Sequence, residues 1–299
     1  MLRVLFFTQN RWAYGTIHHA LAKELYKKGI YANLMDWTQT YSREEFKLLM
    51  ATYDVFVTHP EAVMGMHHMY GVPLDRVVAM GHGQWDLLHS INPDFDFYPH
   101  LRNYGVISDV LKRKSAEFGI SREPAVARLG IHFDVLYNRP SESLARVGYS
   151  GDKEVKNFFG EEIKRSHLVR SAVEGTGLEL VEHSYYNHLC MPGYYRTIDA
   201  VVMSSTEEAG GLPMMEAAAA GRLPIGTPVG YFEENGPRGA GIVVPLEESQ
   251  FVEKTRSTLC MFRDSPYAYR TMCEAAQTFA RDNYDWPVVI DQWVELITC

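Results

Sequence analysis

Cysteine is scarce in this sequence. Four cysteines occur among 299 residues, and no two of them form a C-x-x-C pair: Cys190, Cys260, Cys273 and Cys299. Disulfide frameworks and cysteine-based zinc sites both depend on cysteines at recognisable, close spacings. We therefore expect neither kind of framework in this protein.

Long apolar stretches are missing as well. Runs such as 55–57 are far shorter than the roughly 20 apolar residues that cross a bilayer. The start of the chain, 1–8, leads directly into polar Gln9 and Asn10 without the small-residue cleavage site of a signal peptide. The sequence predicts no membrane span and a cytoplasmic location.

A surplus of basic residues is also absent. The chain has 29 Lys and Arg against 37 Asp and Glu, a formal net charge of −8, which argues against a broad nucleic-acid surface because phosphates need a basic face. Basic stretches at 23–28 and 112–114 fall at the ends of expected helices, where cations stabilise the helix dipole. We prefer this interpretation to a membrane-binding patch. No G-x-G-x-x-G follows the first expected strand, so a dinucleotide oxidoreductase is also disfavoured.

What the sequence does contain is an alternation of short apolar strands with amphipathic helices, which is typical of α/β folds with parallel sheets. The expected strands are 3–7, 32–36, 54–58, 77–80, 104–108 and 125–129, then 145–149, 178–182, 200–204, 223–227 and 241–244. The expected helices are 17–28, 43–52, 109–118, about 161–173, 213–220, 250–262, 266–282 and 286–297. The first helix is expected to follow a polar turn that runs through Gly15.

This pattern divides into two doubly wound units. A polar, proline-containing stretch at 139–143 is the preferred linker. We therefore expect a first domain over 1–140 and a second domain over 141–283, followed by a final helix at about 284–299.

The most informative segment is 204–230, which reads SSTEEAGGLPMMEAAAAGRLPIGTPVG. Pro213 stands where a helix begins, since its missing N–H is not needed there, and Gly221 stands just past the end of that helix. Gly210, Gly211 and Leu212 form the approach to the helix. Glycines let a backbone come close to a ligand, and a helix N-terminus offers N–H groups to an anion. The segment predicts a diphosphate site.

Two carboxylates frame this anion site. Glu208 precedes the glycines, and Glu216 lies one turn into the helix. Carboxylates do not bind phosphates, so their natural partners here are hydroxyl groups of a ribose and a sugar on either side of a diphosphate. Either glutamate alone is explained by an acidic turn that stabilises its helix. The pair together with the glycines indicates a nucleotide sugar.

The stretch E-A-G-G-L-P-M-M-E, from Glu208 to Glu216, resembles the E-x7-E motif of retaining GT-B glycosyltransferases of family 4, the glycosyl transferases group 1. This resemblance implies a GT-B architecture, in which two Rossmann-like doubly wound parallel-sheet domains face a cleft. It implies that 1–140 is the acceptor-side domain and 141–283 the nucleotide-sugar donor domain, and that the final helix at about 284–299 packs back on the first domain. It implies that Glu208 contacts the donor sugar and that Glu216 contacts the ribose hydroxyls. It also implies that Gly210 and Gly211 present N–H groups to the diphosphate.

The sequence departs from the family pattern at one point. The family usually has an Arg and a Lys, five residues apart, after the first strand of the second domain, but Tyr149 stands where the Arg is expected. Lys164 or Arg165 could replace the missing charge, and Lys153 and Lys156 are nearer in sequence. We take Lys164 as the donor-binding candidate. The other cations stay open, as does the plain reading of Lys164 as a solvated residue.

Ligands of such sheets bind beyond the carboxyl ends of the strands. The first turn there contains Gly15, a donor-side candidate, and Arg11, Trp12 and Tyr14, which are candidates for stacking on a sugar or for acceptor contact. Packing of the two aromatic residues at the base of the loop is an equally good explanation.

Two histidines follow later strands of the same domain. His59 is a further candidate for sugar or acceptor contact. His82 is a candidate catalytic residue, because Met80-Gly81-His82-Gly83 resembles a strand-end H-G near the donor sugar in this family; Asp86 is near enough to orient its ring. The pair His67-His68 has no third ligand at metal spacing, so no metal and no cofactor are expected besides the nucleotide-diphosphate sugar as co-substrate.

The expected activity is transfer of a sugar from a nucleotide-diphosphate sugar to an acceptor hydroxyl. The family resemblance implies retention of the anomeric configuration, and no carboxylate of the motif is an obvious nucleophile, so we favour front-face attack. Two alternatives remain: a sugar-nucleotide epimerase or phosphorylase on the same fold, and a non-catalytic nucleotide-sugar-binding protein. The acceptor is open among a saccharide, a lipid-linked sugar, a small metabolite and a modified base, with long nucleic acid disfavoured.

Overall fold

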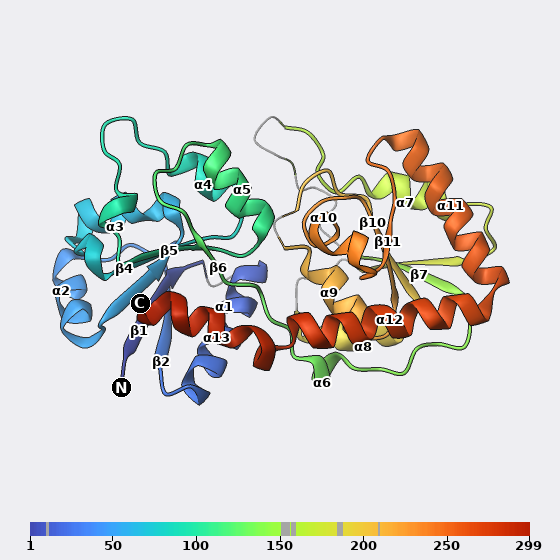
Figure 1. Cartoon of the computed structure of the whole chain (residues 1–299), viewed down its shortest axis with the longest axis horizontal. Coiled ribbons are helices and arrows are strands. Elements are labelled where there is room, and N and C mark those ends of the chain that lie inside the picture. The colour runs from blue at the N-terminus through green and yellow to red at the C-terminus, as the bar shows by residue number, and fades with distance from the viewer. Residues whose placement is uncertain (10–11, 151–155, 157–159, 184–187, 209) are drawn as a thin grey trace. The chain divides into compact units, whose positions relative to one another are not determined.

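The computed structural model describes residues 1–9, 12–150, 156, 160–183, 188–208 and 210–299, with the side chains of 12–14, 150 and 237 left aside (Figure 1). The chain forms two compact units. The first consists of 1–130 together with 286–299, and the second of 131–285. The boundary between the units, at 130/131, falls before the linker that the sequence suggested at 139–143.

The first unit is built on a six-stranded sheet. Its strand order is β2-β1-β3-β4-β5-β6, and the paired strands are parallel. In spatial order these are Tyr31–Asp36, Arg3–Thr8, Val55–Thr58, Val77–Gly81, Asn103–Val106 and Ala125–Val126. β3 and β4 are buried along their whole length, which is why they read as unbroken apolar runs. The order reverses between β1 and β3, so a ligand is expected beyond the carboxyl ends of these two strands.

The helices of the first unit connect its strands and cover its sheet. They are α1 (Trp12–Lys27), α2 (Arg43–Thr52), α3 (Val63–Tyr70), α4 (Gln84–His89), α5 (Asp109–Glu117) and α13 (Trp286–Thr298). Short 3-10 turns lie at Pro60–Ala62, Leu74–Arg76 and Tyr98–His100. α2 has the expected bounds because Ser42 and Glu45 form a capping box at its start.

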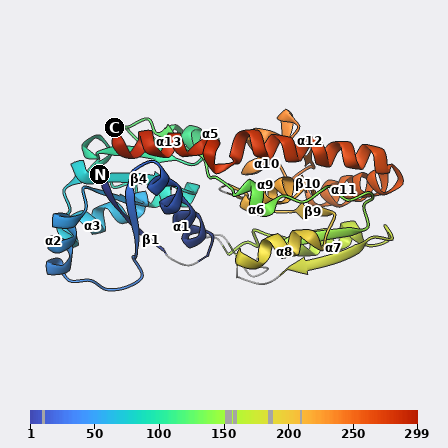
Figure 2. The ribbon, with the colours of Figure 1, turned by 90° about the horizontal axis from the view of Figure 1, so that it is seen from below.

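The last helix, α13, closes the core of the first unit. Figure 1 and Figure 2 both show the two chain ends in this unit, and α13 (red) lies among blue and green elements. A side chain on Gly130 would come within 2.3 Å of the Trp286 ring, and one on Gly105 within 2.6 Å of Leu296. The Trp293 indole donates to the Arg128 carbonyl at 2.8 Å. The helix α13 therefore packs closely in this unit, with Leu296 against Gly105 of β5 and Trp286 against Gly130.

The second unit is built on a five-stranded sheet in the order β11-β10-β9-β7-β8, with parallel pairs throughout. In spatial order these are Ile242–Val243, Leu223–Gly226, Ala200–Met203, Arg146–Ser150 and Glu179–His183. The order reverses between β7 and β9. The ligand edge of this sheet is therefore expected beyond their carboxyl ends.

The helices of the second unit are α6 (Phe133–Leu136), α7 (Ser166–Val173), α8 (Met191–Arg196), α9 (Leu212–Ala219), α10 (Tyr231–Asn235), α11 (Glu248–Asp264) and α12 (Pro266–Tyr284). Short 3-10 turns lie at His188–Cys190 and Gly236–Arg238. α7 packs on α11, and α9 on α12 (Figure 1). Both pairs cover the sheet, whose core includes Val147, Val202, Ile225, Phe251 and Tyr269.

The buried carboxylate of Asp199 fixes the entry to this sheet. One oxygen accepts from the backbone N–H groups of Ala145 and Arg146, at 3.0 and 2.8 Å, and the other accepts from the Ser141 hydroxyl at 2.6 Å. Unpaired buried carboxylates are costly, whereas a carboxylate with three donors is satisfied. The start of β7 is thereby held beside the start of β9.

The expected α/β fold of two parallel sheets is confirmed, with two corrections to its helices. The first helix begins at Trp12 rather than at Ile17, so Gly15 lies inside it and not in a turn. Apolar periodicity starts only at Ile17, and helical geometry extends beyond that signal because propensity is a weak guide where packing decides. The helix expected from 161 begins at Ser166. Arg165 has a left-handed backbone with φ 46°, which a helix cannot include.

Candidate functional site

The loop from β9 to α9 carries the E-x7-E segment at the ligand edge of the second sheet. Gly211 is the N-terminal cap of α9 and has φ +62°. A side chain there would lie 3.1 Å from the Tyr231 Cβ, so the position requires glycine in both conformation and space. Leu212 begins the helix and Pro213 follows it, with no N–H to satisfy. Such a helix start directs N–H groups and a positive dipole end toward an anion.

Glu208 lies before this helix start and contacts a lysine. Lys164 Nζ donates to Glu208 Oε1 in a close ion pair, and Ser205 Oγ donates to the same oxygen at 2.7 Å. The Glu208 and Lys164 side chains are 14% and 22% exposed, so the pair is largely shielded from water and its charges interact more strongly than on an open surface. Gly230, at φ +52°, leaves room for Glu208, because a side chain there would come within 2.7 Å of the Glu208 Cβ.

Hydrogen bonds to backbone carbonyls fix the segment that carries Lys164. The Ser204 hydroxyl donates to the carbonyls of Lys164 and Arg165, at 2.6 and 3.0 Å, and Thr206 N–H donates to Ile163 at 2.9 Å. The Arg165 guanidinium turns the other way and donates to the carbonyls of Ser204 and Leu246, at 2.8 and 3.0 Å. Of the two adjacent cations Lys164 and Arg165, Lys164 therefore contacts Glu208, whereas Arg165 bonds to backbone carbonyls after β9 and before α11.

Two further cations were considered from the sequence. Lys156 is exposed, and its backbone forms an isolated antiparallel β-bridge with Glu162. Lys153 lies outside the described residues.

Glu216, the second glutamate of the motif, is 3% exposed in the second turn of α9. Its Oε2 accepts from the Tyr195 hydroxyl at 2.8 Å, and its Oε1 lies 2.6 Å from His188 Nε2. The hydrogen bond to Glu216 raises the pKa of His188, with burial acting in the opposite direction. Burial and the Glu216 charge hold the pKa of Tyr195 well above its usual range. Glu216 is thus oriented by hydrogen bonds from two neighbours.

Three buried histidines gather at the ligand edge of the first sheet. His59 and His82 follow β3 and β4, and His18 lies on α1. Asp86 Oδ2 accepts from the backbone N–H of His82 and Gly83, at 2.7 and 3.0 Å, and lies 3.4 Å from His59 Nδ1. Burial, followed by the neighbouring His59, holds the pKa of His82 well below its usual range. His82 is therefore a neutral imidazole in a fixed loop, and its role toward a donor sugar stays a prediction.

The remaining predicted residues lie in or beside the start of α1. Arg11 is outside the described residues. Trp12 and Tyr14 are described only by their helical backbone, and Gly15 is buried. Their suggested contacts with a donor or acceptor stay predictions.

Sequence reasoning missed three side chains that contact the motif glutamates: Tyr195 and His188 at Glu216, and Ser205 at Glu208. Tyr195 lies next to Tyr194 shortly before β9, and this aromatic pair was a usable signal. No local pattern marked His188, because its contact with Glu216 spans two elements. Ser205 lay in the segment already singled out, at the end of the expected strand.

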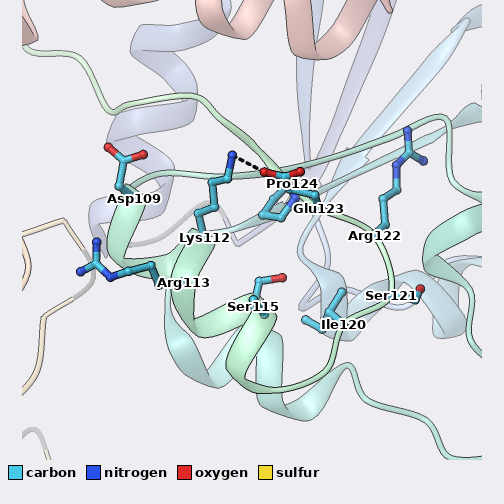
Figure 3. A pocket seen from close by; sticks show the side chains of 10 residues that line it. Asp109, Lys112, Arg113, Ser115, Ile120, Ser121, Arg122, Glu123 and Pro124 are labelled. Carbon is cyan, nitrogen blue, oxygen red and sulfur yellow. Dashed lines mark ion pairs between the residues drawn. The ribbon is translucent and has the colours of Figure 1, made fainter.

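A pocket of about 610 Å³ lies elsewhere in the first unit, between α5 and the segment that leads into β6 (Figure 3). Asp109, Lys112 and Arg113 of α5 line it together with Arg122 and Glu123, and Lys112 points toward Glu123 (Figure 3). Lys112 pairs with Glu123 across it at 2.6 Å. This is a surface ion pair of small energetic value, and the pocket includes none of the predicted site residues.

Among the described residues, no helix is both long and apolar enough to cross a membrane. Residues 149–260 match the family model for glycosyl transferases group 1. No curated protein sequence matches the chain significantly. The matched range contains Lys164, Glu208 and Glu216, so the resemblance seen in the E-x7-E segment is confirmed at the level of group 1.

Solved structures with the same fold cover the whole chain. The chain is similar to Anabaena Alr3699/HepE in complex with UDP-glucose, with a TM-score of 0.75 and 13% identity over 99% of both chains. It is also similar to the catalytic domain of starch synthase IV from Arabidopsis thaliana bound to ADP and acarbose, with a TM-score of 0.70 and 12% identity over 99% of both chains.

A third similar structure is an alpha-glucosyltransferase in complex with UDP and a 13-mer DNA containing an HMU base, with a TM-score of 0.67 and 10% identity over 100% of both chains. These similarities show a GT-B fold. Residues 149–260, which match the group 1 family model, lie within the second unit of that fold.

Proposed function

We propose that this chain, a group 1 glycosyltransferase on a GT-B fold, moves a sugar from a nucleoside-diphosphate sugar to an acceptor hydroxyl with retention of the anomeric configuration. The observation that carries the proposal is the placement of Lys164 and Glu208 beside the start of α9. A cation and a helix N-terminus suit a diphosphate, and a carboxylate suits sugar hydroxyls. The three features lie at the switch point of the second sheet, where such ligands bind.

Each part of the donor has a candidate partner. The diphosphate is assigned to Lys164 and to the N–H groups of Gly210, Gly211 and Leu212. The ribose hydroxyls are assigned to Glu216, which keeps acceptor capacity beside Tyr195 and His188 because each carboxylate oxygen offers two lone pairs. The sugar is assigned to Glu208. Lys164 would exchange part of its ion pair with Glu208 for the diphosphate, so it replaces the arginine that Tyr149 displaces from the family pattern.

The reaction breaks the bond between the anomeric carbon and the diphosphate oxygen and forms a bond from that carbon to the acceptor oxygen. The negative charge that develops on the leaving diphosphate is the main quantity to stabilise, and preorganised N–H groups with a cation do so without reorganisation. The acceptor proton passes to the leaving diphosphate. Attack from the same face keeps the configuration and needs no enzymic nucleophile.

Uridine diphosphate sugars are the first donors to test, because the similar Anabaena protein was solved with UDP-glucose. The acceptor class stays open among saccharides, lipid-linked sugars, small metabolites and modified bases. The similar structure with DNA containing an HMU base is a reason to keep a modified base in the acceptor screen.

Calorimetric titration tests the donor site directly. Wild type and Lys164→Met are titrated with UDP, GDP, ADP and their glucose derivatives, with Lys254→Met on the exposed side of α11 as the matched control. We expect micromolar binding of one nucleotide. It should weaken by about 10- to 100-fold in Lys164→Met, since a charge-assisted bond contributes about 1.5–3 kcal/mol, and stay unchanged in the control.

No binding by any member to folded wild type would refute the proposal. Turnover then separates the alternatives. Transfer to an acceptor with the donor's anomeric coupling constant in proton NMR supports a retaining transferase. A sugar phosphate formed from added phosphate would indicate a phosphorylase, and an altered donor sugar would indicate an epimerase.

A further inference from the structure

Three histidines from distant parts of the chain converge in the interior of the first unit. One nitrogen each of His18, His59 and His82 lies within 4.8 Å of the other two. The ring centroids are 5.0 Å apart for His59 and His82, 5.1 Å for His18 and His82, and 6.2 Å for His18 and His59. Each of the three residues is 2% exposed. Three convergent, buried imidazoles are an uncommon arrangement for a hydrophobic core.

The three histidines lie on one helix and directly after the ends of two paired strands. His59 follows β3 and His82 follows β4, which pair along Phe56–Thr58 and Val77–Ala79. His18 comes from α1, whose neighbour Leu21 is fully buried. A site whose ligands lie on helices and strand ends is preorganised better than one on loops.

The surroundings suit a bound cation that is held by neutral ligands. Phe6 lies 5.3 Å from His18, Trp37 lies 4.7 Å from His59, and Trp293 lies 6.4 Å from His82, measured between ring centroids. This aromatic shell places the three imidazoles in largely apolar surroundings, where uncharged ligands cost less to bury than charged ones.

A carboxylate and a hydroxyl lie beside the His59 ring. Asp86 Oδ2 lies 3.4 Å from His59 Nδ1, and Thr8 Oγ1 lies 3.1 Å from His59 Nε2. Metal-binding histidines usually donate their second ring N–H to a carboxylate, which fixes the tautomer and orients the ring. With its Nδ1 proton directed to Asp86, His59 offers the Nε2 lone pair, and the Thr8 hydroxyl can donate to that lone pair in the metal-free protein.

We propose that His18, His59 and His82 bind one divalent transition-metal ion, with Zn²⁺ as the best chemical match. Zn²⁺ takes imidazole nitrogens at about 2.0–2.1 Å in tetrahedral geometry, which places the nitrogens about 3.4 Å apart. Side-chain movements of about 1 Å therefore close the observed cluster around an ion. The fourth position is left for a water. The ion ties α1 to the ends of β3 and β4 and stabilises the first unit.

This assignment is independent of the donor site, because Lys164, Glu208 and Glu216 all lie in the second unit. It differs from the expectation drawn from the sequence, which considered only the adjacent pair His67-His68. The three ligands are far apart in sequence, so no spacing motif announces them.

Cobalt titration of the full chain tests the proposal. The protein is purified without a polyhistidine tag, stripped with EDTA and titrated with Co²⁺, whose visible absorption reports tetrahedral coordination by nitrogen. Zn²⁺ content is measured by mass spectrometry after reconstitution and desalting. We expect one ion per chain, displacement of Co²⁺ by Zn²⁺, and a Tm increase of about 5–10 °C at an ion concentration 100 times the Kd.

Variants assign the ligands. His18→Gln and His59→Gln should lose the Co²⁺ spectrum, whereas His68→Gln, exposed on α3, should keep it. If a variant fails to fold, the wild-type titration alone decides. The proposal is overturned if stripped wild type shows neither a Co²⁺ spectrum nor a Tm shift, or if His18→Gln and His59→Gln fold and bind the ion as tightly as wild type. UDP binding measured on the same samples keeps a failure here separate from a failure of the donor site.

Discussion

Replacing Glu216 by glutamine tests the assignment of the ribose with little disturbance of the fold. The Glu216 side chain is buried, and its two oxygens contact the Tyr195 hydroxyl and His188. Glutamine has nearly the same shape and keeps an oxygen that can accept from Tyr195. The substitution removes the negative charge, so donor binding is expected to change more than stability.

The magnitude follows from the difference between charged and neutral hydrogen bonds. A bond to a charged group contributes about 1.5–3 kcal/mol and a neutral one about 0.5–1.5 kcal/mol. If both ribose hydroxyls donate to Glu216, the loss of charge costs about 2–3 kcal/mol, which corresponds to a Kd increase of about 30- to 150-fold. Glu216→Ala should lose as much affinity. It should also lower the free energy of unfolding by about 1–3 kcal/mol, because the buried Tyr195 hydroxyl loses its carboxylate partner.

Isothermal titration with UDP measures the first quantity, and urea melts measure the second. Glu253→Gln, an exposed position on α11, is the matched control and should bind UDP as wild type does. A Kd within threefold of wild type for Glu216→Gln, in a protein that binds UDP, would show that the ribose does not contact this carboxylate. The donor would then be oriented by other groups of the second unit.

Three further predictions concern stability in the second unit. His188→Ala should destabilise the protein more at pH 6 than at pH 9 in urea melts, because the hydrogen bond to Glu216 raises the pKa of His188 in the folded state. The stability that this bond contributes is complete below the unfolded pKa of about 6.5 and is lost as pH rises through the folded pKa. An equal loss of stability at both pH values would contradict this. Asp199→Asn should lower the free energy of unfolding by about 1–3 kcal/mol, since one of the backbone or hydroxyl donors on the carboxylate loses its acceptor, and an unchanged melt would refute it. Gly211→Ala should cost about 1–2 kcal/mol for its left-handed backbone and weaken UDP binding, whereas the control Gly193→Ala, on a helix with open space at the Cβ, should be neutral or slightly stabilising.

Much of the fold is predictable because its signals are local. The central strands of both sheets are buried on both faces, so they appear in the sequence as continuous apolar runs without alternating polar residues. α2 is fixed by a capping box and α9 by a proline at its start and a glycine after its end, and these residues act within one turn of the helix. The donor-site motif is predictable for the same reason, since it lies on one loop and one helix.

The remainder depends on contacts between distant segments. Two contacts arise from tertiary structure, so no spacing in the sequence specifies them. They are the contact of His188 with Glu216 and the hydrogen bond from the Ser204 hydroxyl, after β9, to the Lys164 carbonyl. Short helices such as α4 and α8 offer fewer than two turns of periodicity. The early start of α1 and the late start of α7 follow from packing and from the left-handed Arg165, which propensity does not reveal.

The return of α13 to the first unit has a consequence for how the chain is made. Residues 1–130 are synthesised before the second unit, yet the core of their own unit stays incomplete until Trp286 and Trp293 follow. The second unit, a continuous stretch, can fold while the first still waits for its last helix. Domains usually fold in the order of synthesis, whereas this arrangement lets the second unit complete its core first. We expect residues 1–130 to leave exposed the apolar surface that α13 later covers, and chaperones to bind them during that interval.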